Sequence, residues 1–172
     1  MKKELFANPD LCTGCNRCTI ACSAKKEGVF QPSKARLRVT NFPLRGYSVP
    51  NICFQCPKAN CLEACPTSAM LRDAAGVVRL NEELCTGCGA CVSACPYGMV
   101  EQDAKGIPFK CDLCDGDPAC VKECHAEALL YANGDAALFQ LKAAQMKTRH
   151  QSGTPLEKRL KVAETLKRSS RG

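Results

Sequence analysis

The sequence holds sixteen cysteines, which fall into four groups of four with none left over. The groups are Cys12, Cys15, Cys18 and Cys22; Cys53, Cys56, Cys61 and Cys65; Cys85, Cys88, Cys91 and Cys95; and Cys111, Cys114, Cys120 and Cys124. In the first and third groups, two residues separate each of the first three cysteines, and three residues precede the fourth. The second and fourth groups keep this outline with a wider middle gap. A fold for this chain must bring these thiols together.

The spacing of the first and third groups is that of the cysteine run by which bacterial ferredoxins bind [4Fe–4S] clusters, and Pro96 supplies the trailing proline of that run. Gly14 and Gly87 lie inside the loops and let the backbone approach closely, with its N–H groups turned toward the sulfurs. The fourth cysteine lies one helical turn further on, too far to close the same cluster. The pattern predicts four [4Fe–4S] clusters with all sixteen cysteines as ligands.

Disulfides and zinc are the alternatives for so many cysteines. Residues 1–10 lack the apolar run of an export signal, and no stretch approaches the length of a membrane span. We therefore expect a cytoplasmic protein without a direct membrane span, where thiols stay reduced and clustered cysteines bind metal. Structural zinc sites use two separated C-x2-C pairs. The second and fourth groups match that pattern in isolation, and the first and third do not.

The formal charge of +7 is concentrated near the end of the chain. Residues 126–172 hold nine basic and four acidic residues, and residues 1–125 hold fifteen and thirteen. A cluster with four thiolates carries about −2, so four sites add about −8 and bring the loaded protein near neutrality. No nucleic-acid motif or aromatic platform accompanies the basic tail. We expect no nucleic-acid partner; the opposing hypothesis, a basic zinc module on nucleic acid, predicts a colourless protein.

The chain repeats internally, since residues 83–95 resemble residues 10–22 and residues 120–129 resemble residues 61–70. Each unit is expected to form a cysteine loop, a short helix and a brief strand. The expected strands are Lys3–Ala7, Leu37–Thr40, Gly76–Leu80, Val100–Gln102 and Leu129–Tyr131. The predicted fold is α+β, with two ferredoxin-like modules, one inserted in the other, and a C-terminal helical extension. The predicted parts are a split module (residues 1–52 and 104–131), an inserted module (residues 53–103) and a basic helical tail (residues 132–172).

Two helices are expected in the tail. Asp135 is a candidate N-cap for a helix that ends near Arg149. Thr154 and Glu157 form a capping box around Pro155 at the start of the second helix. Its expected apolar face consists of Leu156, Leu160 and Ala163, with Val162 and Leu166 nearby. Either both helices pack on the chain's own core, or at least one docks on a partner subunit.

The motifs resemble a known family, the four-cluster iron–sulfur subunits of molybdenum and tungsten oxidoreductases, to which the dimethyl sulfoxide reductase iron–sulfur subunit belongs. The residues that carry the resemblance are 49–56, 65–67, 91–98 and 110–114. Residues 27–32 and 36–39 are most similar to the short cytosolic members associated with aldehyde oxidoreductase and carbon monoxide dehydrogenase. The resemblance covers about residues 3–131.

This resemblance implies crossed ligation, in which each fourth cysteine serves the other cluster of its module. The implied sets are Cys12, Cys15, Cys18 and Cys124; Cys111, Cys114, Cys120 and Cys22; Cys53, Cys56, Cys61 and Cys95; and Cys85, Cys88, Cys91 and Cys65. The chain departs from the family at His125, where proline is usual, and we expect a surface histidine there. We also expect His150 to be exposed in a polar linker.

The family further implies an electron-transfer subunit without a catalytic site of its own. The implied partner is a catalytic oxidoreductase subunit, with a tungsten or molybdenum aldehyde oxidoreductase as the leading hypothesis. The alternatives are a formate dehydrogenase, carbon monoxide dehydrogenase or hydrogenase partner, or a free diffusible polyferredoxin. A flavoprotein, another ferredoxin or a quinone-linked membrane protein would accept the electrons. End-to-end assembly of copies through the tail is a further prediction.

Overall fold

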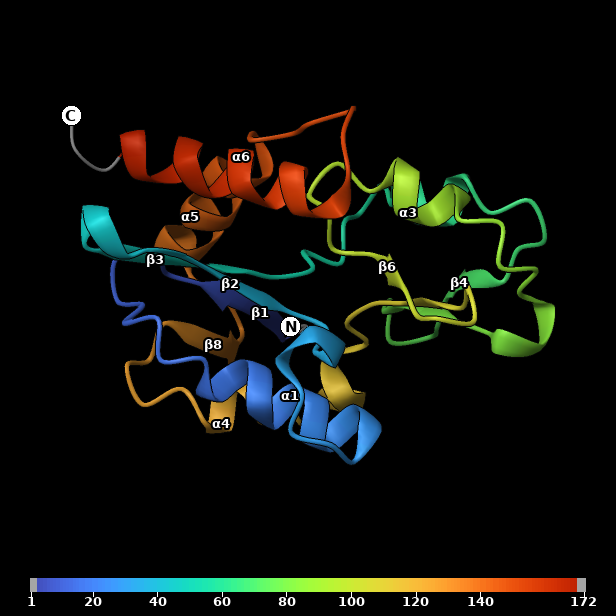
Figure 1. Cartoon of the computed structure of the whole chain (residues 1–172), viewed down its shortest axis with the longest axis horizontal. Helices are drawn as coiled ribbons and strands as arrows, with labels where there is room; N and C mark the ends of the chain where they lie inside the picture. Colours follow the sequence, from blue (N-terminus) through green and yellow to red (C-terminus); the bar gives the residue numbers. More distant parts are fainter. Residues whose placement is uncertain (1–2, 170–172) are drawn as a thin grey trace.

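The computed structural model describes residues 3–169, with side chains as far as Leu166 (Figure 1). The outer ends of the predicted split module and tail, at residues 1–2 and 170–172, lie outside this range. The strands are β1 (Glu4–Ala7), β2 (Arg38–Phe42), β3 (Tyr47–Asn51), β4 (Met70–Arg72), β5 (Val78–Leu80), β6 (Glu101–Gln102), β7 (Pro108–Phe109) and β8 (Leu129–Ala132). The α-helices are α1 (Arg17–Glu27), α2 (Asn60–Glu63), α3 (Ala90–Ala94), α4 (Ala119–Lys122), α5 (Ala136–Met146) and α6 (Pro155–Ser169). Short 3-10 turns are η1 (Pro32–Lys34), η2 (Pro43–Arg45), η3 (Glu82–Leu84) and η4 (Leu113–Gly116).

The strands form antiparallel pairs: β1 with β8, β2 with β3, β4 with β5, and β6 with β7. The first of these joins distant parts of the chain, because Glu4 lies opposite Ala132 and Ala7 opposite Leu129. The other three are local hairpins. An isolated two-stranded ribbon is at best marginally stable in water, so these pairs depend on what packs against them.

The mixture of short helices and strands confirms the α+β class. Each of the five expected strands overlaps a strand of the structure, namely β1, β2, β5, β6 and β8. Strands β3, β4 and β7 were not predicted. Pro50 interrupts the apolar pattern of β3, Pro108 opens the two-residue β7, and β4 follows a cysteine helix with only a short connection.

Two helix pairs organise the cysteine-bearing parts, since α1 packs against α4 and α2 against α3. In Figure 1, α1 and α4 lie at the lower left, whereas α3 lies at the right with β4 and β6. Buried apolar side chains join these parts into one core, among them Leu5, Ile52, Val78, Val100 and Leu129. In the described part of the chain, no helix has the length and apolar character needed to cross a membrane.

Helix α5 packs on the chain's own core through β1. Asp135 is its N-cap and accepts a hydrogen bond from the N–H of Leu138 (2.8 Å), as predicted. Lys142 pairs with Glu4, and the Gln145 side chain donates to the carbonyl of Ala7 (2.7 Å). These polar contacts attach α5 to the edge strand of the first sheet.

Helix α6 also packs on the chain's own core, against β2 and β3. The capping box is present, because the Thr154 N–H donates to Glu157 (2.8 Å) and the Glu157 N–H donates to the Thr154 hydroxyl (3.3 Å). The apolar face expected from the sequence is confirmed in part. Ala163 and Val162 are buried, but Leu156 is 59% exposed and Leu160 is 38% exposed. Among the described side chains of α6, Lys158 and Arg159 are buried in addition.

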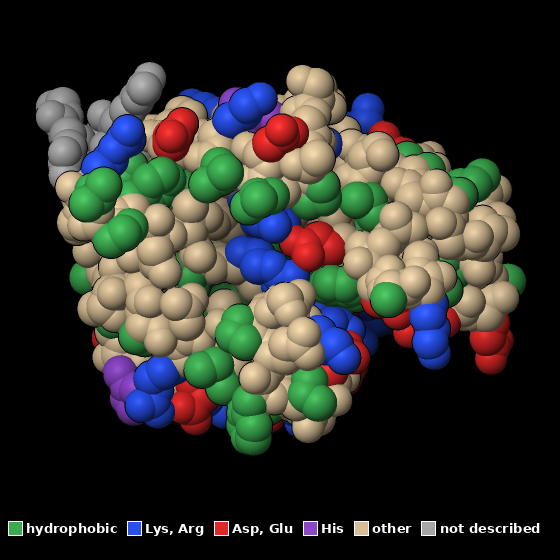
Figure 2. All heavy atoms as spheres, viewed as in Figure 1, with side chains coloured by type: hydrophobic (Ala, Val, Ile, Leu, Met, Phe, Trp, Pro, Cys, Tyr) green, Lys and Arg blue, Asp and Glu red, His purple; other side chains and the backbone are tan. Residues whose placement is uncertain are grey.

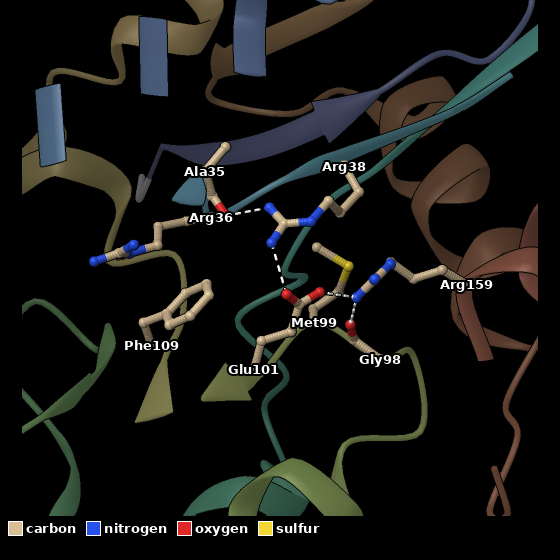
Figure 3. A pocket seen from close by; sticks show the side chains of 8 residues that line it. All are labelled: Ala35, Arg36, Arg38, Gly98, Met99, Glu101, Phe109 and Arg159. Carbon is tan, nitrogen blue, oxygen red and sulfur yellow. Dashed lines mark hydrogen bonds and ion pairs between the residues drawn. The ribbon is translucent and has the colours of Figure 1, made fainter. Parts of the chain in front are cut away.

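The contacts of Arg159 explain part of this difference between the expected and the observed buried face of α6. A pocket lies between β2, β6 and α6, and Figure 3 shows Arg38 and Arg159 reaching Glu101 from its two sides. Arg159 also donates to the carbonyl of Gly98 (2.5 Å). Basic and acidic side chains meet in a hollow near the middle of the face shown in Figure 2. Lys158 and Arg159 are thus buried where the apolar pattern predicts leucines. Burial of these long side chains is possible because their charged ends bind carbonyl and carboxylate groups.

The start of α6 depends on Gly98. This residue has φ +66°, and a Cβ atom there would lie 2.2 Å from the carbonyl oxygen of Pro155. We expect Gly98→Ala to lower the free energy of unfolding by about 1–2 kcal/mol through its left-handed backbone, and further through displacement of α6. Thermal or denaturant unfolding measures this loss.

Gly28→Ala is the matched control, because Gly28 has φ +68° with nothing within 4 Å of its Cβ position. Gly28→Ala introduces the same left-handed backbone strain as Gly98→Ala, but its Cβ atom contacts no neighbouring residue. Equal destabilisation by the two substitutions would show that the contact between Gly98 and Pro155 contributes nothing.

Candidate metal centres

The four cysteine motifs share one local backbone conformation. The residue directly before the second cysteine has a positive φ in every motif: Gly14 (74°), Gln55 (49°), Gly87 (68°) and Leu113 (61°). Successive N–H groups around such a left-handed residue form a concave anion-binding nest. The wider groups therefore share this left-handed turn with the ferredoxin-spaced ones, even where the residue is not glycine.

A second left-handed residue follows the fourth cysteine of three motifs. It stands three positions later, at Ser68 (φ 56°), Gly98 (66°) and Glu127 (51°). In the first motif the chain continues instead in α1. This turn ends the short cysteine helices α2, α3 and α4 and leads toward the strand or loop that follows.

Backbone N–H groups donate to cysteine sulfurs in both kinds of turn. The backbone N–H groups of the left-handed residues Gly87 and Leu113 donate to the Sγ atoms of Cys85 and Cys111, respectively, each at a distance of 3.4 Å. The fourth cysteines also accept hydrogen bonds: Cys22 from Arg36 (3.2 Å), Cys95 from Met99 (3.3 Å) and Cys65 from Met70 (3.5 Å). Such bonds favour the charged thiolate and, at metal sites, fix the ligand and tune the metal.

Three cavities are each lined by at least four cysteines. The first is lined by Cys12, Cys15, Cys18 and Cys124, and the second by Cys53, Cys56, Cys61 and Cys95. The third is lined by Cys22, Cys111, Cys114 and Cys120, and Cys53 of the second cavity also lines it. The space free of protein atoms is about 330, 380 and 350 Å³ in the same order. Apart from the shared Cys53, each cavity combines three cysteines of one sequence group with the fourth cysteine of another.

The remaining cysteines lie near one another as well. Burial raises the pKa of Cys91 to about 11, and the nearby thiols of Cys65 and Cys85 add to this shift. Cys88 is exposed on the same loop. Cys65 again comes from a different sequence group than its three neighbours.

Burial dominates the electrostatics of the inner thiols. It raises the pKa of Cys18 and Cys61 to about 12, and that of Cys56 to about 11. Thiols on the same cavity raise these values further. By contrast, the N–H of Arg17 lowers the pKa of the exposed Cys15. The buried thiols are neutral near pH 7 until a cation binds, and metal binding then releases their protons.

These residues fit [4Fe–4S] clusters. Cubane clusters are held by four cysteine thiolates, and their potentials depend on hydrogen bonds to sulfur and on exposure. The cavities offer four thiols each, with N–H donors directed at the sulfurs. Within residues 3–169, no three metal-ligating side chains are grouped as ligands of a single metal ion.

The cavities are neighbours in a fixed order. Cys53 lines both its own cavity and the one that contains Cys22. Helix α1 carries Cys18 and Cys22 into two adjacent cavities, and Cys91 and Cys95 belong to α3 and its C-terminal end. The four cysteine sets therefore follow one another through the molecule, with the exposed Cys15 in the first set and the exposed Cys88 in the last.

The two histidines differ from each other. His125 is exposed, as expected from the sequence. The expectation for His150 was wrong, because this residue is only half-exposed. The backbone N–H of His150 donates to the carbonyl of Pro96 (3.0 Å). The Nε2 atom of its ring is buried without a hydrogen-bond partner among the described residues. The linker is therefore held to the core at His150, whereas residues 151–154 are exposed.

The buried cations near the cysteines also escaped the sequence analysis. Lys110 is 7% exposed and Lys158 is 1% exposed. Because Lys110 directly precedes Cys111, its position in the sequence could have indicated a cation close to the cysteines. Nothing in the sequence connects Lys158 with a cysteine, because the contact joins α6 to residues more than sixty positions earlier.

Comparison with known proteins agrees with these centres. Residues 44–133 match the family model described as a 4Fe-4S dicluster domain, and residues 9–25 match a 4Fe-4S binding domain. The polyferredoxin-like subunit of an aliphatic sulfonate oxidoreductase from Pyrococcus furiosus is 46% identical over 124 residues, covering 70% of each chain. A ferredoxin from Methanocaldococcus jannaschii is 38% identical and covers 81% of this chain and 77% of its own. Hydrogenase-4 component A from Escherichia coli is 31% identical and covers 84% and 89%.

The dicluster model spans more than half of the 172 residues, and each of these relatives covers more than two thirds of the chain. The two matching models and the cysteine motifs account for several [4Fe–4S] clusters. This chain belongs to the family of 4Fe-4S dicluster-domain iron–sulfur proteins.

Proposed function

We propose that the chain holds four [4Fe–4S] clusters and conducts single electrons between a catalytic oxidoreductase subunit and a downstream acceptor. Each bound cluster would take up and release one electron. The chain's own residues hold the clusters, surround them with N–H donors and exclude water from the inner ones. The observation that carries the proposal is the uninterrupted succession of four cysteine sets, with an exposed cysteine in each terminal set.

The proposed ligand sets are crossed. They are Cys12, Cys15, Cys18 and Cys124; Cys22, Cys111, Cys114 and Cys120; Cys53, Cys56, Cys61 and Cys95; and Cys65, Cys85, Cys88 and Cys91. The three cysteine-lined cavities support the first three sets, and the mutual influence of Cys65, Cys85 and Cys91 supports the last. Two clusters would then belong to a split module (residues 1–52 and 104–131) and two to an inserted module (residues 53–103). The pairing of β1 with β8 and of α1 with α4 supports this division.

The proposed partner is a catalytic oxidoreductase subunit, with a tungsten or molybdenum aldehyde oxidoreductase as the specific hypothesis. The resemblance of residues 27–32 and 36–39 to the short members associated with aldehyde oxidoreductase supports the specific partner. The names of the relatives, which include subunits of a sulfonate oxidoreductase and a hydrogenase, support an oxidoreductase partner in general. A flavoprotein or a ferredoxin is the proposed acceptor.

Anaerobic purification from the native host, with stoichiometric partners identified by mass spectrometry, tests the partner. A large co-purifying subunit that contains tungsten or molybdenum is the expected result. If the brown protein is isolated alone at every salt concentration, the chain is a free carrier and the subunit hypothesis fails.

Crossed ligation predicts which cysteines act on the same cluster. Cys18→Ser and Cys124→Ser should alter the same electron paramagnetic resonance signal, although the two residues lie far apart in sequence. Cys22→Ser should alter a different signal, although Cys22 is one helical turn from Cys18 on α1. Each substitution should also remove at most about four of about sixteen irons per chain. A shared signal for Cys18→Ser and Cys22→Ser would refute crossed ligation.

Removal of iron should unfold most of residues 3–131. The strands there are short, and the cysteines surround cavities in place of a larger apolar core, so cluster binding supplies folding free energy. Circular dichroism of the anaerobically chelated protein should show loss of cooperative thermal unfolding. The untreated protein, incubated identically without chelator, is the control. A sharp thermal transition in the iron-free chain would contradict this expectation.

A further inference from the structure

Helix α6 brings a buried positive charge to one of the four centres. We propose that Lys158, together with Lys110, is the counter-charge of the centre formed by Cys53, Cys56, Cys61 and Cys95, and that this pair raises its reduction potential. The inference rests on the proposed four-cluster function. It assigns the tail an electrostatic role inside the electron path.

Lys158 lies in the first turns of α6 and is 1% exposed. Its Nζ atom donates to the carbonyl of Ser93 (2.7 Å) and to the carbonyl of Cys95 (3.1 Å). Both acceptors are neutral, so they orient the ammonium group without neutralising it. No carboxylate among the described side chains pairs with this lysine.

Lys110 approaches the same cavity from another direction. It is 7% exposed and lines the cavity of Cys53, Cys56, Cys61 and Cys95. Its Nζ atom donates to the carbonyls of Val78 (2.5 Å) and Cys111 (2.8 Å). Like Lys158, it has neutral acceptors only, in the part of the chain that the structure describes.

The other buried cations have carboxylate partners. Lys142 pairs with Glu4, and Arg159 pairs with Glu101, which it shares with Arg38. Lys110 and Lys158 therefore differ from them in having no carboxylate partner among the described residues. Both lie beside the set of Cys53, Cys56, Cys61 and Cys95, and Lys110 also contacts the carbonyl of Cys111 in the neighbouring set. A buried ion without a partner is strongly destabilising, so an ion pair or a bound charged group is expected beside it.

A loaded four-thiolate centre supplies that negative charge. A site with about −2 becomes about −3 on reduction, and nearby cations in a low-dielectric interior favour the more negative state. The two lysines thus stabilise the reduced form more than the oxidised form, which raises the potential.

The test is a mediated redox titration of the full-length, cluster-loaded protein, followed by electron paramagnetic resonance. Lys158→Met removes the charge and keeps most of the side-chain length. One midpoint potential should move to a more negative value while the others remain unchanged. Lys158→Arg, which keeps the charge, should restore most of the wild-type midpoint. Lys161→Met is the matched control, because Lys161 is exposed on the same helix, and it should shift none.

The shifted signal should be the one altered by Cys61→Ser. Lys110→Met should shift this same signal in the same direction. If Lys158→Met loses iron, the Lys110→Met variant alone tests the inference. Unchanged midpoints in both variants at full iron content would overturn the inference, as would a shift confined to another centre. A wild-type protein with fewer than four cluster signals would instead overturn the proposed function.

Discussion

The buried thiols and the N–H groups that face them are the interaction on which the structure depends. Short two-stranded sheets and helices of four or five residues do not bury enough apolar surface to be stable alone. The cysteine cavities occupy the positions that a larger apolar core would fill. The left-handed residues before each second cysteine turn the backbone donors inward, so the fold and the metal sites are specified by the same turns.

Much of this architecture could be predicted from the sequence, because metal-ligand spacing is a local signal. The Asp135 N-cap and the capping box at Thr154 depend on residues a few positions apart, and both predictions are confirmed. Strands β4 and β7 were missed because two- or three-residue strands carry almost no periodicity. The left-handed conformation of Gln55 and Leu113 was missed because neither residue type favours it.

The tail shows where apolar periodicity fails. Leu156 and Leu160 recur at helical spacing, yet the helix buries Lys158 and Arg159. The acceptors of these cations are carbonyls and a carboxylate in a different part of the chain, contacts that a local pattern does not encode. Once clusters are bound, the cysteine sites in the interior carry negative charge, which favours buried cations. A hydrophobicity scale assumes an uncharged interior and therefore assigns such residues to the surface.

The antiparallel pairing of β1 with β8 has a consequence for synthesis of the protein. When Cys12, Cys15 and Cys18 are added to the growing chain, the fourth thiol of their cavity, Cys124, and the strand that pairs with β1 are still more than a hundred residues from being made. In contrast, β4 pairs with β5 and α2 packs against α3, and these partners are close together in sequence. The growing chain therefore exposes its first cysteines, open to oxidation or to the wrong metal, for most of translation, and its earliest motif is among the last to be completed.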